Sequence, residues 1–261
     1  MKLISLNVGL KIDNATEVGK FIKSHDPDFV AYQEIMRHFD ENVFEMYKSE
    51  FGIEKIAKFP YKFFGPKWIT DKYMKNGKIH RDLGGMAEQG NEIMSKFPII
   101  SATNEHYYKQ YSYELDWTNW RRDDEPRSVI IVELDVEGKK LQILNLHGIW
   151  SEDKKGNEKA VEQCKYVLKA AKRKNIPTII AGDFNLLPEM KGIKLISKEF
   201  RNLINEFNIK STRPNFNDGT DKGGDVVDYI FVNDKIKVND FKVIETQISD
   251  HLPLILDFDI L

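Results

Sequence analysis

The amino-acid sequence predicts a single α/β domain spanning residues 1–261, and three observations carry this prediction. Short apolar runs alternate with amphipathic segments along the chain, which is the pattern of strands and helices in α/β folds. No internal repeat, low-complexity tract or Pro/Gly/Ser-rich linker divides the sequence, and its length fits one large domain. Polar residues end or open many of the apolar runs, which indicates mixed sheets that share one polar edge.

Composition excludes several classes of protein. The chain is 41% hydrophobic and 31% charged, as ordinary soluble proteins are. It has no apolar run of about 18 residues and no basic-then-apolar opening, so we expect a cytoplasmic protein without stable membrane association. A single cysteine, Cys164, excludes an internal disulfide framework and a zinc site built on several thiolates. The net charge of -2 excludes nucleic-acid binding through overall charge but not through local basic patches.

The predicted secondary structure contains short strands rich in Val, Ile, Leu or Phe and three amphipathic helices. A helix is predicted from Asn14–Glu17, which resembles a capping box, and further helices at about 40–50 and about 157–174. Cys164 lies on the apolar face of the last helix, so we interpret it as a core residue rather than a nucleophile. The strands are expected at Lys2–Leu6, Phe29–Gln33, Ile93–Ser95, Ser128–Leu134, Leu141–Leu146, Thr178–Ala181, Asp228–Val232, Val238–Ile244 and Leu254–Phe258.

Two segments, residues 54–81 and 106–122, fit no regular pattern and are predicted to be loops. Both interleave Lys or Arg with aromatic residues, which is what a single-stranded nucleic acid surface needs: cations for phosphates and rings for bases. We therefore expect four of their residues to contact substrate: Trp68, Trp120, Arg121 and Arg122. The alternative is that these rings pack the loops onto the core.

Chemistry-bearing residues gather at the ends of the predicted strands. If the strands that end in these residues run one way, and Asp228–Val232 and Leu254–Phe258 run the opposite way, all of these residues lie on one edge. Clustered carboxylates repel one another, and a divalent cation is the usual remedy. The available ligands are hard oxygens, which favour Mg²⁺ or Mn²⁺ over Zn²⁺. The residues at these ends are Asn7, Glu34, His147, Asp183, Asn185, Asp228, Asp250 and His251.

This ordered set resembles the endonuclease/exonuclease/phosphatase superfamily, whose fold is that of pancreatic deoxyribonuclease. The resemblance implies a four-layer α/β (α+β) sandwich of two mostly antiparallel sheets with helices outside. It also implies hydrolysis of a phosphoester with a divalent metal, usually Mg²⁺, with Mn²⁺ as a substitute. The matching pieces are Leu6-Asn7, Gln33-Glu34, Gly90–Pro98, Asn145–His147, Gly182–Asn185, Asp228–Phe231 and Ser249–His251.

The resemblance assigns metal binding to three residues. Glu34 resembles the main metal ligand of the family. Asn7 and Asp250 stand where the family places residues that help to hold the metal or order the site.

It assigns the chemistry to five others. Asp183 resembles the carboxylate that orients or deprotonates water, and Asn185 resembles its phosphate-binding neighbour. Asp228 matches another acidic site position. His251 and His147 resemble the two histidines that contact the scissile phosphate. One in-line attack of water on phosphorus would follow.

The sequence does not decide which substrate the enzyme would hydrolyse. Nucleic acid is favoured by the two basic and aromatic segments and by the histidine pair, with DNA and RNA not distinguished. A phospholipid or inositol phosphate is the alternative substrate, and a non-catalytic nucleic-acid-binding module is a more distant one. His147 stands where the apurinic-endonuclease branch has tyrosine, which disfavours abasic-site repair. Glu92 leaves two interpretations, an extra site carboxylate or a strand residue that faces solvent. We expect a monomer.

Overall fold

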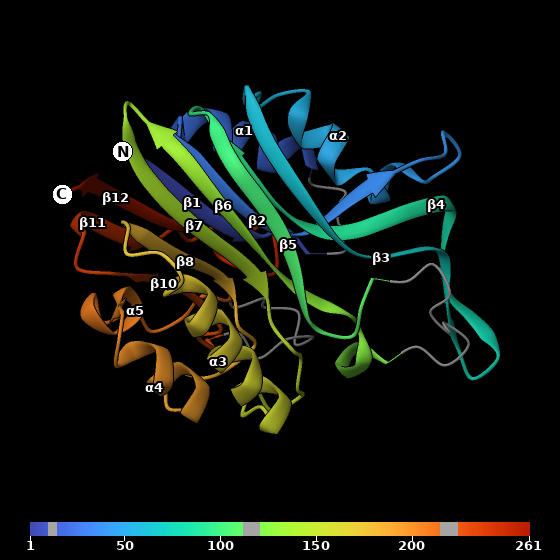
Figure 1. Ribbon diagram of the computed structural model, residues 1–261. Helices are drawn as coiled ribbons and strands as arrows, with labels where there is room; N and C mark the ends of the chain where they lie inside the picture. Colours follow the sequence, from blue (N-terminus) through green and yellow to red (C-terminus); the bar gives the residue numbers. More distant parts are fainter. Residues whose placement is uncertain (10–14, 112–120, 215–223) are drawn as a thin grey trace.

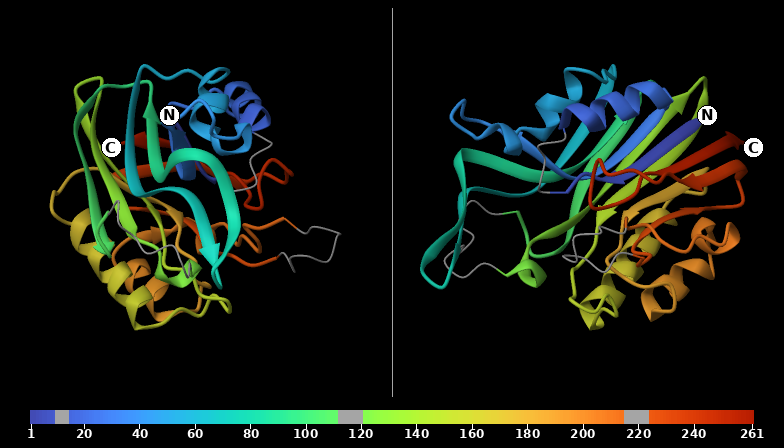
Figure 2. Two further views of the ribbon diagram at one scale, coloured as in Figure 1. Left: turned by 90° about the vertical axis from the view of Figure 1, so that its right-hand side faces the viewer. Right: turned by 180° about the vertical axis from the view of Figure 1, so that it is seen from behind.

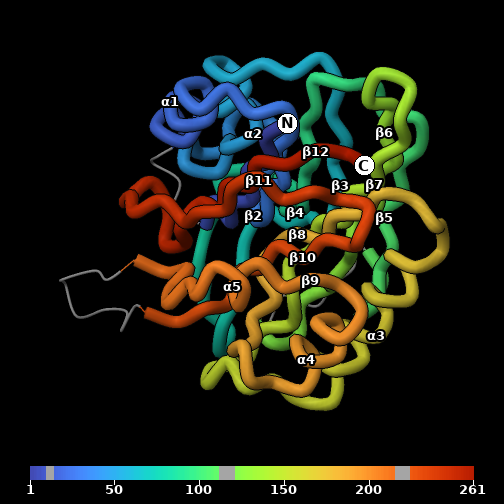
Figure 3. Tube along the Cα trace, turned by 90° about the vertical axis from the view of Figure 1, so that its left-hand side faces the viewer, coloured from blue at the N-terminus to red at the C-terminus, as the bar shows by residue number. Residues whose placement is uncertain are grey.

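The computed structural model describes residues 1–9, 15–111, 121–214 and 224–261. Two six-stranded sheets pack face to face, and helices cover their outer faces (Figure 1). Seen end on, the helices α1 and α2 lie on one side of the paired sheets and α3, α4 and α5 on the other (Figure 3). This arrangement confirms the predicted four-layer sandwich.

The first sheet has the order β11-β12-β1-β2-β4-β3. Its one parallel pair is β1 with β2, and the other neighbours are antiparallel. The pairing register shifts within β2, between Tyr32 and Ile35, and again within β3, between Pro66 and Trp68. The strands are β1 Lys2–Asn7, β2 Phe29–His38, β3 Tyr61–Lys75, β4 Lys78–Ser95, β11 Ile236–Val243 and β12 Leu254–Ile260.

The second sheet has the order β5-β6-β7-β8-β10-β9. It too has a single parallel pair, β7 with β8, and β10 runs antiparallel to β8. The strands are β5 Ile99–Tyr108, β6 Arg127–Val136, β7 Lys139–His147, β8 Thr178–Asp183, β9 Arg201–Asn202 and β10 Asp228–Val232. The strand directions are therefore those that bring the predicted polar ends to one edge.

The helices pack their apolar faces on the sheets. Helix α1 buries Val18 and Ile22 in a cluster with Ile53 of α2 and the outer face of the first sheet. Asn157 caps helix α3, because its side chain accepts a hydrogen bond from the backbone N–H of Ala160 at 3.2 Å. The helices are α1 Ala15–His25, α2 Ser49–Glu54, α3 Glu158–Ala171, α4 Lys191–Ser197 and α5 Leu203–Glu206.

The prediction of a loop over residues 54–81 is wrong. Most of this segment is β3, which forms a long antiparallel hairpin with β4 and extends beyond the rest of the sandwich (Figure 2). The predicted helix at about 40–50 is also wrong, because only a short turn at Glu45–Tyr47 lies there and α2 begins at Ser49. Strand β5 was not anticipated. Such strands form through backbone hydrogen bonds to a partner strand that is distant in the sequence, and the local residue pattern does not reveal that partner.

Buried polar side chains join the two sheets near the carboxyl end of β7. Asn145 of β7 donates from Nδ2 to the backbone oxygens of Tyr32 at 2.8 Å and Glu92 at 2.9 Å. Gln33 of β2 donates to Asn145 Oδ1 at 2.7 Å. Both side chains are fully buried. Tyr32 and Glu92 face each other as the last pair before the register shift in β2, so Asn145 satisfies backbone groups beside the bulge.

The substitution Asn145→Ala should therefore destabilise the fold strongly. It removes the hydrogen bonds to the two buried carbonyls and the one from Gln33, which we expect to lower the free energy of unfolding by about 3 kcal/mol. Urea denaturation measures this change. The exposed Asn239→Ala on β11 is the matched control and should change stability by less than about 0.5 kcal/mol. Equal effects of the two substitutions would contradict a role for the network.

Candidate active site

The strand ends converge at one edge of the sandwich, as the sequence predicts. His147, Asp183 and Asp228 are direct neighbours in register across β7, β8 and β10. Asn7 ends β1 beside the β2 bulge of the other sheet. The loop before β12 is tied to this edge because Ser249 Oγ donates to the backbone oxygen of Asn7 at 2.6 Å.

Asp183 lies at the centre of the site and is 1% exposed. Its carboxylate accepts from the backbone N–H of Asn185 at 2.8 Å and from Asn7 Nδ2 at 3.1 Å. The residue before it, Gly182, has a φ of +142°, and a Cβ there would lie 2.1 Å from the backbone oxygen of Leu146. Only glycine allows strand β8 to approach β7 this closely.

Asn185 is held in a single orientation beside Asp183. It adopts a left-handed φ of +54°, which asparagine tolerates better than most residues. Its Oδ1 accepts from Lys154 Nζ at 2.9 Å, and its Nδ2 donates to the backbone oxygen of Gly148 at 3.2 Å. Lys154 is 6% exposed and was not among the predicted site residues.

His251 is paired with a carboxylate. Its Nδ1 lies 2.9 and 3.0 Å from the two carboxylate oxygens of Asp228, and its Nε2 lies 3.8 Å from Asp183 Oδ2. Burial alone would lower the pKa of His251, but the charges of Asp228 and Asp183 outweigh it and raise the pKa to about 9. His251 is therefore a cation at neutral pH.

His147 lies in a contrasting environment. Its Nε2 is 3.6 Å from the same Asp183 oxygen, while its Nδ1 is 3.2 Å from Lys67 Nζ. Burial, together with the positive charges of Lys67 and Arg127, holds the pKa of His147 well below its usual value. The site thus contains one charged and one neutral imidazole.

Lys67 is a site residue that the sequence reading missed. It lies at the register shift in β3 and is 0% exposed. Burial, reinforced by the charge of Arg127, lowers the pKa of Lys67 to about 7. The segment was interpreted as a surface loop, and nothing in the sequence distinguishes this lysine from the other basic residues around it. Only the hairpin with β4 brings it to the site.

Glu34 is the strongest candidate for a metal ligand. The β2 bulge gives it a φ of +60°, a strained value that bulges next to active sites often require. Burial raises the pKa of its carboxyl, and the charge of Lys67 offsets this only in part. Asn7 Nδ2 lies 3.4 Å from Glu34 Oε1, with Asn7 Oδ1 accepting from the backbone N–H of Gly9 at 2.9 Å. Asn7 therefore presents its amide NH₂ to the carboxylates in this arrangement.

Asp250 approaches the same region from the loop before β12. A Cβ on Gly9 would lie 2.6 Å from Asp250 Oδ1, so the loop packs directly on the chain that follows β1. Desolvation opposes ionisation of Asp250, but the charges of His251 and Arg213 lower its pKa below the usual range. The oxygens of Glu34 and Asp250 are hard donors, and the one cysteine is buried on α3. This donor set fits Mg²⁺ or Mn²⁺.

A second group of ligand atoms belongs to Asp183, Asp228 and His251, which lie within 4.8 Å of one another. The Asp228 carboxylate already engages His251 Nδ1. A protonated imidazole donates hydrogen bonds and cannot ligate a metal through the same nitrogens. Glu34 and Asp250 are therefore the better candidates for metal ligands.

The expected substrate-contact residues have different outcomes. The expectation for Trp68 is wrong, because its ring is 0% exposed and packs edge-on against Tyr73 in the core, so no face is open to a base. Arg121 is exposed and paired with Asp123 at 2.6 Å. Arg122 is exposed and lies 5.5 Å from the ring centre of Trp150. Trp120 lies outside the described residues.

Glu92 fits neither interpretation that its sequence position allowed. It is 0% exposed, and its carboxylate lies near Glu50 and Glu54, beneath α2 and on the far face of the first sheet from the site. Burial raises the pKa of Glu92 well above its usual value. Among the described residues, its carboxyl oxygens have no hydrogen-bond partner.

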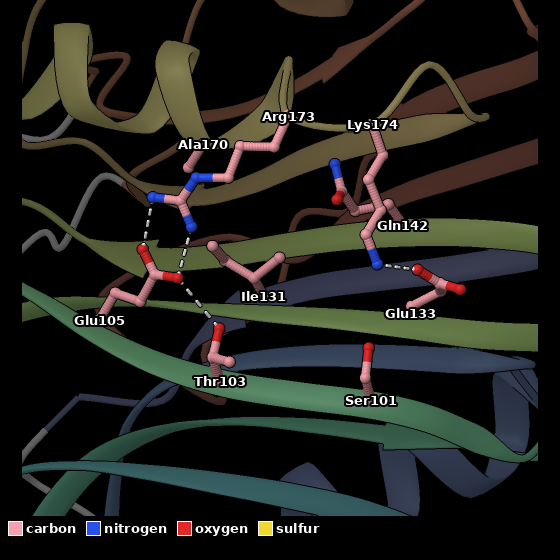
Figure 4. A pocket seen from close by; sticks show the side chains of 9 residues that line it. All are labelled: Ser101, Thr103, Glu105, Ile131, Glu133, Gln142, Ala170, Arg173 and Lys174. Atoms are coloured by element: carbon pink, nitrogen blue, oxygen red, sulfur yellow. Dashed lines mark hydrogen bonds and ion pairs between the residues drawn. The ribbon is translucent and has the colours of Figure 1, made fainter.

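A small groove lies apart from the strand-end site. It measures about 140 Å³ and lies between the end of α3 and the outer face of β5, β6 and β7 (Figure 4). Its charged residues are paired, Arg173 with Glu105 and Lys174 with Glu133. The groove therefore offers no uncompensated charge for an ionic ligand.

The ion pair of His251 should make stability depend on pH. Because its pKa rises from 6.5 to about 9 on folding, the pair stabilises the protein fully below pH 6.5 and is lost as pH rises through about 9. Over this window wild type should lose up to ~3 kcal/mol of unfolding free energy relative to His251→Gln. Urea denaturation in EDTA measures both proteins. Parallel pH curves would contradict the raised pKa.

Comparisons with known proteins agree with this fold. Residues 4–251 match the model of the Endonuclease/Exonuclease/phosphatase family. No curated protein matches the chain significantly.

Similar solved structures cover nearly the whole chain. An endonuclease/exonuclease/phosphatase from Beutenbergia cavernae has a TM-score of 0.74 at 14% identity, over 100% of this chain and 71% of that one. The mannosyl-6-phosphatase Bt3783 of Bacteroides thetaiotaomicron has 0.67 at 16%, over 99% of each. The human Nocturnin catalytic domain with bound sulfate has 0.65 at 16%, over 100% and 94%. At these identities the likeness shows the fold, and the family match places the chain in the endonuclease/exonuclease/phosphatase family, whose members hydrolyse phosphoester bonds.

Proposed function

We propose that the protein is a divalent-cation-dependent phosphodiesterase that hydrolyses nucleic acid. One observation carries the proposal: Asp183 Oδ2 is approached by Nε2 of both His147 and His251, at 3.6 and 3.8 Å, beside the Glu34 carboxylate. A base, two imidazole donors and an oxygen-rich cation site meet at one point. These are the groups that attack of water on a phosphoester requires.

Each residue has a distinct task in this reaction. Asp183 orients the attacking water and accepts its proton, while the Asn185 backbone N–H keeps the carboxylate in place. His251, held as a cation by Asp228, donates from Nε2 to a phosphoryl oxygen as negative charge builds there. The new P–O bond forms as the ester P–O bond opposite it breaks. A cation held by Glu34 and Asp250 would stabilise the developing charge on the phosphoryl oxygens.

Exposed cations support nucleic acid as the substrate. The β3–β4 hairpin exposes Lys72, Lys75 and Lys78 beyond the end of the sheets (Figure 2). Arg122 lies exposed beside Trp150, close to the β7 end of the site. Such cations suit a phosphate backbone. The expected stacking rings give less support, since Trp68 is buried.

A phosphorylated sugar or inositol is the second candidate. Its support is the recessed position of the reacting groups, because Asp183, His147 and His251 are each no more than 5% exposed. A further buried cation, Lys154, contacts Asn185 beside Asp183, which suits a compact phosphate dianion. The similar solved structure named as a mannosyl-6-phosphatase also supports it. No helix among the described residues is long and apolar enough to cross a membrane.

A substrate panel tests the proposal. Labelled DNA and RNA, a 5′-tyrosyl oligonucleotide, sphingomyelin, sugar phosphates and inositol phosphates are each incubated with Mg²⁺, Mn²⁺ or EDTA. Nucleic acid cleavage that EDTA abolishes is expected. Cleavage of only a sugar or inositol phosphate would select the second candidate. No product from any substrate with either metal, with nucleic acid binding retained in EDTA, would indicate a non-catalytic module.

The substitution Asp183→Asn should lower turnover by at least about 100-fold, because the amide cannot accept the proton of water. Its folding should be retained, since the amide keeps the shape of the carboxylate. The exposed Asp259→Asn on β12 is the matched control and should keep wild-type turnover. Full activity of Asp183→Asn, measured on whichever substrate the panel identifies, would refute the assignment.

Salt dependence separates the two substrate classes. Affinity for nucleic acid should fall linearly in log–log terms with salt concentration, with a slope of about 0.7 to 0.9 for each phosphate contact. Lys75→Gln together with Lys78→Gln should flatten that slope, and Lys165→Gln on the exposed face of α3 should not. Fluorescence anisotropy with a labelled oligonucleotide in EDTA measures both. An unchanged slope in the double variant would exclude the hairpin as a backbone contact.

A further inference from the structure

Lys67 is a buried lysine that no step above uses. Lysine is almost never fully buried without a partner, because its ammonium loses its hydration. The side chain enters the site because the β3 register shifts at this residue, between Pro66 and Trp68. That shift is supported by Asn104 of β5, which donates from Nδ2 to the backbone oxygen of Pro66 at 2.8 Å. The bulge is thus a built feature that aims Lys67 inward.

The partner of Lys67 determines what it does. Its Nζ lies 3.2 Å from Nδ1 of His147. Glu34 Oε1, the other charged group near that nitrogen, is 3.7 Å away and beyond hydrogen-bond distance. When Lys67 is an ammonium, a group that can only donate, Nδ1 accepts and the ring proton of His147 resides on Nε2. Arg127, paired with Glu125 at 3.2 Å, is another buried cation whose charge acts on His147.

His251, in the same site, contacts an anionic partner where His147 contacts a cationic one. Its Nδ1 meets the carboxylate of Asp228, which can only accept, so that nitrogen carries a proton. The two rings nevertheless aim their Nε2 atoms at the same oxygen of Asp183. Two histidines are therefore oriented alike by partners of opposite charge.

We propose that Lys67 is a positioning residue that holds His147 as its Nε2–H tautomer. This proposal rests on the proposed phosphoesterase function, because it makes His147 a neutral hydrogen-bond donor to a phosphoryl oxygen beside Asp183. Lys67 itself acts through the ring and not on the substrate. A second anchor holds the strand end, since Tyr107 donates from its hydroxyl to the backbone oxygen of His147 at 3.1 Å.

A spectroscopic test needs no substrate. The full chain is labelled with ¹⁵N-histidine, and the His147 signals are identified by their absence in His147→Ala. Wild type should show a protonated Nε2 and an unprotonated Nδ1. Lys67→Met, which keeps the volume but removes the donor, should lose that single tautomer, whereas the exposed Lys165→Met should keep it. A protonated Nδ1 in wild type would overturn the proposal, and so would an unchanged tautomer in Lys67→Met.

A double-mutant cycle tests the functional consequence. Lys67→Met should lower kcat by about 10- to 100-fold, as loss of a partner that orients a site histidine does. In the His147→Ala background the same change should have little further effect, because Lys67 acts through that ring. Independent effects in the two backgrounds would overturn the proposal. A wild-type protein inactive on every substrate would refute the proposed function and leave the tautomer result standing.

Discussion

The burial of Asp183 is the constraint on which the rest of the site depends. A carboxylate removed from water is costly unless hydrogen bonds and positive charge compensate it. The chain supplies hydrogen bonds from Asn7 and from the backbone N–H of Asn185. It supplies imidazoles at 3.6 and 3.8 Å from His147 and His251. The same groups that make this carboxylate tolerable are the ones that chemistry on a phosphate uses.

Both sheets contribute residues to the edge that carries the site. Each contains one parallel pair, β1 with β2 and β7 with β8, and the carboxyl ends of both pairs point to the site. Regular strands alone would not complete it, because side chains alternate between faces. Register shifts in β2 and β3 change that alternation locally and bring Glu34 and Lys67 to the same point. Strand direction sets the edge, and bulges set the final residues.

The polar contact between the sheets lies directly behind this edge. Gln33 immediately precedes the strained Glu34, and its side chain bonds Asn145 of the opposite sheet. Asn145 in turn donates to the carbonyls of Tyr32 and Glu92, the last pair before the bulge. The bulge that presents Glu34 is therefore stabilised by the same network that joins the sheets. Loosening this contact would disturb both the sandwich and the site.

The sequence by itself determined the strand ends and their chemistry. Short apolar runs that end in Asn7, Asp183 or His147 predicted both the strands and their shared edge, because the residue that ends a buried strand lies at the edge of the sheet. Local patterns fail where a distant partner decides. Trp68 and Lys67 looked like surface residues of a basic loop, but pairing of β3 with β4 buries both. The tertiary structure alone decided this, since ladder bonds, bulges and burial depend on strands far away in the chain.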